Sequence, residues 1–499
     1  MSTERKLFIN TVTGFMKQIL TVICGFILPR YMLLYYGSAI NGLISSITFF
    51  MSFISLLDMG VGAVIQSNLY KPLADKDPEQ ISRIVKASER FFRRLAYTFI
   101  IYTIILCFIF AIMLDTGYTA AFTISLLCII SISTFAQYFF GMSYQLLLNA
   151  DQRAYVQLLM QIGTTALNTI SAIALMKCGA SVHIVKLMTA FVYVLRPLGQ
   201  MIYVHKHYDL DKDIEVIGEP IKQKWNGFAQ HLSAVVCANV DVAVLTMFST
   251  LETISVYSIY YSITNGITEI IMMAAIGLES LLGNMIAQKE QEQLIWVFSL
   301  IEWMIHTIVT IVFTIAAALI IPFVSVYTKE IKDVNYIVPS FGFLMLGACA
   351  ARCLRIPYFR LIKAAGHFKE TEIGSFVAAV LNIIITVLLV FKFGLIGAAT
   401  GTLLAMVYHT CYFAWYLRKN ILQRPFKYFC EHVFVDLMTV SIAYFVLKNF
   451  TFDGISYLAW ILFAAKIAPI VILISIVVNL IFCPKLFIQN IRLLFKHTP

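Results

Sequence analysis

Long apolar runs separated by short polar segments recur along the chain, from Phe8 almost to its last residues. A transmembrane helix needs about twenty consecutive, mostly apolar residues. The pattern predicts an all-α, polytopic membrane protein of about fourteen transmembrane helices. We place these helices at 8–29, 38–65, 95–114, 119–148, 155–176, 182–204, 226–248, 254–286, 295–321, 336–363, 371–391, 394–417, 431–448 and 457–482.

Composition agrees with this pattern and narrows the class of protein. The 499 residues are 60% hydrophobic and only 13% charged, whereas soluble domains carry roughly a quarter charged residues. The ten cysteines are scattered through apolar runs without CxxC pairs, which is typical of small core residues. The sequence contains no Walker loop and no HExxH spacing. We therefore expect no catalytic residues, no metal site and no cofactor, and a protein that is not an enzyme.

The net charge of +10 reflects membrane topology. If the N-terminus is cytoplasmic, segments on that side hold 24 of the 37 Lys and Arg residues, and segments on the opposite side hold six. This bias follows the positive-inside rule and predicts that both termini are cytoplasmic. It also argues against a nucleic acid partner. Within the longest basic segment, 66–94, Asp77 and Pro78 precede apolar residues at helical spacing, which predicts a short helix on the membrane surface.

The chain contains an internal repeat that covers its first twelve predicted spans. Short motifs recur 213 to 215 residues apart, each at the same place relative to the predicted helices. Six helices separate the two copies, so both have the same orientation in the membrane and are related by a pseudo-twofold axis along the membrane normal. The matched segments are 13–15 with 226–228, 149–152 with 363–366, 166–170 with 380–384, and Gly179 with Gly394.

This repeat predicts three parts of the chain. They are an N-terminal six-helix lobe at 1–210, a C-terminal six-helix lobe at 211–418, and two additional helices with a cytoplasmic tail at 419–499. Transporters built from repeats bind substrate at the interface between them, near the bilayer midplane. The repeat alone therefore favours a transporter.

Charged residues within the spans mark candidate binding sites, because they are costly in hydrocarbon. The tenth span contains Arg352, Arg355 and Arg360, and Pro357 is expected to kink it. Three guanidiniums on one broken helix suit an anionic ligand, since guanidinium binds phosphate in a bidentate manner. The alternative for Arg360 is that it marks the cytoplasmic helix end.

Other intramembrane charges complete the candidate set. Arg196 and Lys17 are further candidates for substrate binding, whereas Lys186 and Lys466 are close enough to helix ends to reach the interface. Glu269 and Asp241 are candidates for ion coupling or for pairing with an arginine.

Several motifs, taken in order, resemble Wzx-type polysaccharide flippases of the multidrug/oligosaccharidyl-lipid/polysaccharide exporter superfamily. The plan of twelve helices plus two is similar to that branch as well. In the lipid II branch of the superfamily, basic residues gather in the first span, which here offers only Lys17 and Arg30. The motifs that carry the resemblance are 36–43, 57–62, 239–241, 256–258, 365–366 and 381–383.

The resemblance implies alternating-access translocation of an undecaprenyl-diphosphate-linked oligosaccharide across the bacterial cytoplasmic (inner) membrane. The product would be O-antigen, capsule or exopolysaccharide. Expected partners are the lipid-linked glycan, membrane lipids, and polysaccharide polymerase and chain-length proteins. The alternatives are a cation-coupled multidrug exporter of the same fold, which would use acidic residues, and a non-transporting scaffold of a polysaccharide synthesis complex.

Overall fold

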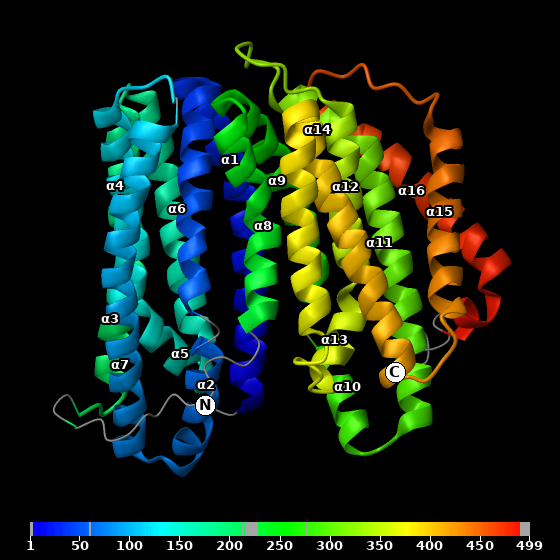
Figure 1. Cartoon of the computed structure of the whole chain (residues 1–499), viewed down its shortest axis with the longest axis horizontal. Helices are drawn as coiled ribbons and strands as arrows, with labels where there is room; N and C mark the ends of the chain where they lie inside the picture. The colour runs from blue at the N-terminus through cyan, green and yellow to red at the C-terminus, as the bar shows by residue number, and fades with distance from the viewer. Residues whose placement is uncertain are drawn as a thin grey trace. The chain divides into compact units, whose positions relative to one another are not determined.

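The regular elements of the described chain are all helices. The computed structural model describes residues 3–58, 61–114, 116–211, 214, 228–275 and 277–489. Figure 1 shows these helices along the chain. Their bounds are α1 Thr3–Ser52, η1 Phe53–Asp58, α2 Val61–Asp75, α3 Pro78–Phe108, η2 Ile109–Met113, α4 Ala120–Ala136, η3 Gln137–Gly141, α5 Met142–Ala150, α6 Ala154–Lys177, α7 Val182–His207, α8 Phe228–Phe248, α9 Leu251–Ala274, α10 Leu278–Ala287, α11 Gln291–Tyr327, α12 Pro339–Leu354, α13 Ile356–Ala364, α14 Glu372–Asn420, α15 Lys427–Leu447 and α16 Tyr457–Phe482.

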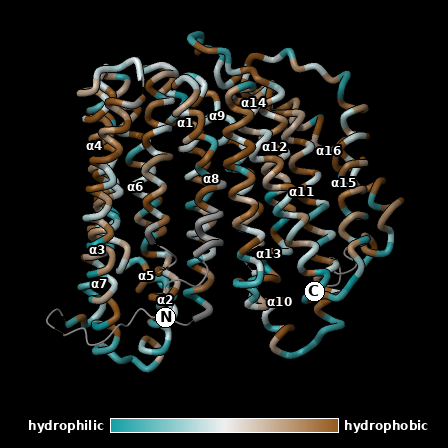
Figure 2. Tube along the Cα trace, in the orientation of Figure 1, coloured by the Kyte–Doolittle hydropathy of each residue, from teal (hydrophilic) through white to brown (hydrophobic). Residues whose placement is uncertain are grey.

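The described residues contain 11 uninterrupted helical stretches that are long and apolar enough to cross a membrane. Two of these stretches each contain two spans, joined at a glycine with non-helical backbone angles. One stretch includes α1, and the other is α14. Helix α8, whose described apolar part is Asn239–Phe248, supplies one more. The all-helical, polytopic architecture of about fourteen spans is confirmed. Figure 2 shows hydrophobic residues along the middle of the helices and hydrophilic residues in many connecting segments.

The joint within α14 is a tight reversal rather than a bend. Gly394 has φ +51° and ψ −124°, a backbone conformation that residues other than glycine rarely adopt. Gly401 then lies directly against Thr386, because a Cβ built on it would be 2.8 Å from the Thr386 backbone nitrogen. Fifteen residues of straight helix would separate these positions by about 22 Å. The eleventh and twelfth spans therefore form a closely packed hairpin.

Enlarging Gly401 should disrupt this hairpin. A Gly401→Val side chain would overlap Thr386, and overpacking a helix contact typically costs about 1–3 kcal/mol. We expect a clearly lower melting temperature for the purified variant. The matched control is Gly163→Ala in α6, where no atom lies within 4 Å of the new Cβ. Equal melting temperatures for the two variants would contradict this packing.

Helix α1 reverses at Gly37, which has φ +79°. Before the glycine, Asn10 donates to the carbonyl of Gln152 and Tyr36 to that of Ala180, so this part follows α6. After it, Ser46 Oγ lies 2.9 Å from Thr246 Oγ1, and Ser52 Oγ donates to Asn239 Oδ1 at 2.7 Å. The second part of α1 therefore runs antiparallel to α8.

The chain divides into two compact units, Met1–Ser258 and Ile259–Pro499. Unit 1 contains α1 to α8 and the start of α9, and unit 2 contains the remaining helices. These units are defined by packing, whereas the boundaries at 210 and 418 come from the sequence repeat and stay predictions.

The expected surface helix in 66–94 is not a separate element. Asp77 Oδ1 does accept hydrogen bonds from the backbone nitrogens of Glu79 and Gln80, and Pro78 occupies the first helical position. The helix that begins there continues without a break to Phe108. The prediction of a short helix on the membrane surface was therefore wrong: the amphipathic residues form the extended start of the third span. Their buried apolar side chains pack within unit 1 instead of on lipid.

Helix α11 packs against the last span, α16, within unit 2. Leu319 of α11 packs with Ile467 and Val471 of α16. Trp303 Nε1 donates to Asn479 Oδ1 at 2.8 Å, so the indole N–H is satisfied within the helix contact. Within unit 2, α16 is thus held against α11 by both apolar and polar contacts.

Candidate functional site

The tenth span is broken where the sequence predicted a kink. Helix α12 ends at Leu354, α13 begins at Ile356, and Arg355 forms the joint. Pro357 follows at once, and its missing N–H removes one hydrogen bond from the helix ladder. The break separates the environments of the three arginines.

Arg355 and Arg360 have partners within unit 2. The Arg355 guanidinium donates to His409 Nδ1 and lies 5.9 Å from the centre of the Phe413 ring. Arginine offers only donors, so His409 Nε2 carries the imidazole proton and donates to Ser375 Oγ at 3.2 Å. Arg360 Nη1 lies 3.0 Å from Glu279 Oε2.

Lys363 also pairs with Glu279, at 3.2 Å. Glu279 belongs to α10 and Lys363 to the last turn of α13, next to the loop that follows Ala364. This cluster compensates the charge of Arg360 and favours the helix-end interpretation of that residue over a ligand contact.

Arg352 differs from the other two arginines. Its side chain is half-buried. Within the described part of the chain, its guanidinium contacts only a weak acceptor, Met272 Sδ at 3.8 Å. Glu269 lies one turn before Met272 on α9, on the same helix face. No hydrogen bond or ion pair joins the Glu269 carboxylate to a side chain among the described residues. Arg352 is therefore an intramembrane cation that lacks a compensating carboxylate within the described chain.

The candidates in unit 1 lie in separate places. Arg196 of α7 is bound to α6, where it donates to the hydroxyls of Thr164 and Thr165. Its guanidinium also lies 4.3 Å from the centre of the Tyr193 ring, a cation–π contact. Lys17 of α1 is half-buried and forms no hydrogen bond or ion pair with the described residues.

Asp241 of α8 is buried at 2% exposure. Its Oδ2 accepts a hydrogen bond from the Tyr257 hydroxyl at 3.1 Å. Both residues belong to unit 1. A buried carboxylate needs such a donor to offset its desolvation.

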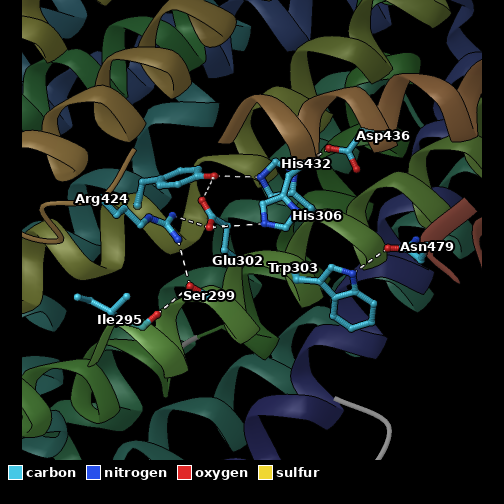
Figure 3. Close-up of polar contacts among 10 residues, drawn as sticks. Ile295, Ser299, Glu302, Trp303, His306, Arg424, His432, Asp436 and Asn479 are labelled. Atoms are coloured by element: carbon cyan, nitrogen blue, oxygen red, sulfur yellow. Dashed lines mark hydrogen bonds and ion pairs between the residues drawn. The ribbon is translucent and has the colours of Figure 1, made fainter. Parts of the chain in front are cut away.

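A buried network that the sequence did not reveal lies in unit 2. Glu302 of α11 is fully buried, and its Oε2 lies 2.5 Å from Arg424 Nη2 in the connection before α15 (Figure 3). Its Oε1 accepts from the Tyr358 hydroxyl of α13 at 2.7 Å. The Arg424 guanidinium also lies 5.0 Å from the Phe298 ring centre. Three segments distant in sequence thus meet at one carboxylate.

The network continues into α15. His306 Nδ1 lies 2.6 Å from Asp436 Oδ2, and Thr310 donates to Asp436 Oδ1 at 2.6 Å. Because the Tyr358 hydroxyl donates its only proton to Glu302, it accepts from His306 Nε2 at 3.0 Å. Both ring nitrogens of His306 are therefore donors, which assigns it as an imidazolium while both carboxylates are ionised.

With this assignment, the charges of the network cancel. Two carboxylates face one guanidinium and one imidazolium, the ring of a neutral His432 lies 3.7 Å from Glu302 Oε2, and hydroxyl donors meet further lone pairs. Buried ion pairs are tolerated when geometry and hydrogen bonds are complete in this way. The network is thus fitted to hold α11, α13 and α15 together, whereas no carboxylate among the described residues pairs with Arg352.

No single sequence signal pointed to this network, because its members are far apart in the chain. Three members of the network are recognisable in the sequence as polar residues within apolar spans: Glu302, His306 and Asp436. Arg424, in contrast, looks like any other basic residue beside a helix end.

No protein-family model matches the chain, and no curated protein sequence does. Solved structures do match. A structure of the lipid II flippase MurJ in an inward closed conformation aligns with a TM-score of 0.70 at 16% identity, covering 96% of this chain and 100% of MurJ. This chain has the fold of that structure.

Two further structures share the fold over a shorter length. An inward-facing multidrug resistance MATE family transporter of the MOP superfamily aligns with a TM-score of 0.63 at 15% identity, over 83% of this chain and 98% of the transporter. An outward-facing MATE family transporter gives 0.55 at 15% identity, over 82% and 96%. The match to MurJ extends over more of the chain than either.

Proposed function

We propose that the chain is a flippase that moves an undecaprenyl-diphosphate-linked oligosaccharide across the bacterial cytoplasmic membrane by alternating access. The glycan would serve the assembly of O-antigen, capsule or exopolysaccharide. In this proposal both termini are cytoplasmic, in keeping with the distribution of Lys and Arg.

One observation carries the proposal. Arg352 is a permanent cation within an apolar span, and the described chain provides no carboxylate for it. Such a charge is costly unless it serves a ligand or a pathway. A diphosphate headgroup supplies the opposite charge, in a geometry that guanidinium binds through two parallel hydrogen bonds. The fold shared with a lipid-linked substrate flippase supports the same class of substrate.

Glu269 favours a second candidate function. A carboxylate without a described partner in a span is a candidate for proton or sodium coupling. The fold shared with MATE family transporters is compatible with a cation-coupled drug exporter. Glu269→Gln should abolish drug export if that function is correct. If the chain is a flippase, the variant should leave drug susceptibility unchanged.

Deleting the gene in a bacterium that makes a surface polysaccharide tests the proposal. We expect undecaprenyl-diphosphate oligosaccharide to accumulate in the cytoplasmic membrane, measured by mass spectrometry of extracted lipids, while surface polysaccharide is lost. The lipid should face the cytoplasm, so that it is not labelled by reagents added to spheroplasts. Unchanged polysaccharide in a strain without another flippase of this fold would contradict the proposal.

A further inference from the structure

A cavity of about 450 Å³ lies within unit 1, separate from the arginines of the tenth span. Its walls come from the second part of α1, from η1, from α4 with the π-helical turn after it, and from α7. This volume falls within the roughly 300–1,000 Å³ typical of small-molecule sites.

Lys186 is the one charged residue among the described residues that line this cavity. It stands in the second turn of α7, which begins at Val182. The position near a helix end suggested an interfacial lysine, but the structure places it in the cavity wall. No hydrogen bond or ion pair joins its ammonium group to the described part of the chain. The cavity thus presents one positive charge to a ligand.

Several hydroxyls of the wall already donate their proton to a backbone carbonyl. Thr48 donates to the carbonyl of Ile44 at 2.8 Å, and Thr189 donates to that of Val185 at 3.0 Å. Ser55 likewise donates to the carbonyl of Ser52 at 2.8 Å. A hydroxyl has one donor and two acceptor lone pairs. In these bonds the hydroxyls can still accept from a ligand, but they have no proton left to donate.

This donor count discriminates between anionic ligands. The oxygens of a diphosphate can only accept hydrogen bonds, which these hydroxyls cannot donate, and one ammonium leaves one of the two negative charges of a diphosphate diester unpaired. A sugar acid carries one carboxylate and several hydroxyl donors. It therefore complements one ammonium surrounded by acceptors.

The aromatic ring of Tyr193 lines the cavity, and the guanidinium of Arg196 packs against this ring. The Tyr193 hydroxyl accepts from Asn168 Nδ2 at 3.2 Å, and Arg196 stacks on its ring at 4.3 Å. Arg196 does not itself line the cavity. Its guanidinium nevertheless strengthens the positive potential on this side, which also favours an anionic sugar.

We propose that this cavity binds an acidic sugar of the transported glycan, with Lys186 contacting the sugar carboxylate and the wall hydroxyls accepting from the sugar hydroxyls. The inference rests on the proposed flippase function and deepens it, because it assigns a substrate class: lipid-linked oligosaccharides that contain a uronic acid or a comparable sugar acid.

Ligand binding can be measured without translocation, by saturation-transfer NMR on detergent-purified full-length protein. The probes are D-glucuronate, D-glucose and inorganic pyrophosphate. Losing a charge-assisted hydrogen bond should weaken glucuronate binding by about ten- to a hundredfold in Lys186→Met. Lys186→Arg should retain binding. The matched control is Lys466→Met, which makes the same change at an exposed lysine of α16.

Three results would overturn the inference. They are equal glucuronate binding by the wild type and Lys186→Met, equal wild-type affinity for glucose and glucuronate, and displacement of glucuronate by equimolar pyrophosphate. The last would assign the cavity to the diphosphate instead. If Lys186→Met melts at a lower temperature than the wild type, Lys186→Gln serves as the second variant. The binding experiment involves no transport. A negative binding result therefore does not contradict the flippase proposal, and a negative translocation result does not change the interpretation of the binding experiment.

Discussion

Arg424→Ala should greatly lower the melting temperature of the purified protein. The substitution leaves Glu302, a fully buried carboxylate, without its charged partner. Breaking a buried ion pair from one side typically costs about 3–5 kcal/mol, because the remaining charge stays desolvated. The loss should also loosen the attachment of α15 to α11. Differential scanning fluorimetry in detergent, together with the size-exclusion profile, measures this effect.

A matched control separates burial from the mere loss of a positive charge. Lys427 pairs with Glu431 one turn further along α15, but the two side chains are 80% and 48% exposed. Exposed pairs of this spacing contribute about 0.3–0.5 kcal/mol, so Lys427→Ala should melt close to the wild type. The double variant Arg424→Gln with Glu302→Gln should recover part of the stability that is lost in Arg424→Ala, because it leaves no unpaired buried charge. Similar melting of Arg424→Ala and Lys427→Ala would contradict the network.

The second large effect concerns transport. Arg352→Ala should fail to complement a strain that lacks the gene, while it accumulates in the membrane at the wild-type level. Its only hydrogen bond among the described residues is with a thioether, so removing the guanidinium breaks no strong polar interaction with them. Arg352→Lys should restore part of the surface polysaccharide, because lysine keeps the charge but loses the bidentate geometry. Quantitative immunoblotting of the polysaccharide provides the readout.

The control for this variant is Arg418→Gln, at an exposed arginine in the last turn of α14. We expect full complementation from it. Full rescue by Arg352→Ala as well would remove this arginine from the binding site. The fold and the buried network would be unaffected by that outcome.

The spans themselves were predictable because runs of apolar residues are sufficient to define them. The interruption at Pro357 was also predictable, since proline lacks the N–H that the helix ladder needs. The reversals at Gly37 and Gly394 agree with the predicted division between neighbouring spans. These are local properties of the chain.

Contacts between distant segments were not predictable from one sequence. Arg424 lies 122 residues from Glu302, and nothing near either residue indicates the pairing. Similarly, Lys186 is four residues past the start of an apolar helix, where reaching the interface was the simplest interpretation. Its cavity exists only because α1, α4 and α7 pack around it. The extension of α3 beyond the span likewise depends on tertiary burial of Ile81, Val85 and Phe92.

Reconstitution into proteoliposomes tests the central claim most directly. The purified chain is combined with an undecaprenyl-diphosphate oligosaccharide in vesicles, and glycan exposed on the outer leaflet is removed with an impermeant glycosidase. The account predicts that nearly all of the lipid becomes cleavable with time when the wild-type protein is present. In protein-free vesicles, and in vesicles containing Arg352→Ala, only about half, the initial outer-leaflet share, should be cleaved. Cleavage that stops at the same fraction in wild-type and protein-free vesicles would contradict the proposal that this chain translocates lipid-linked glycans.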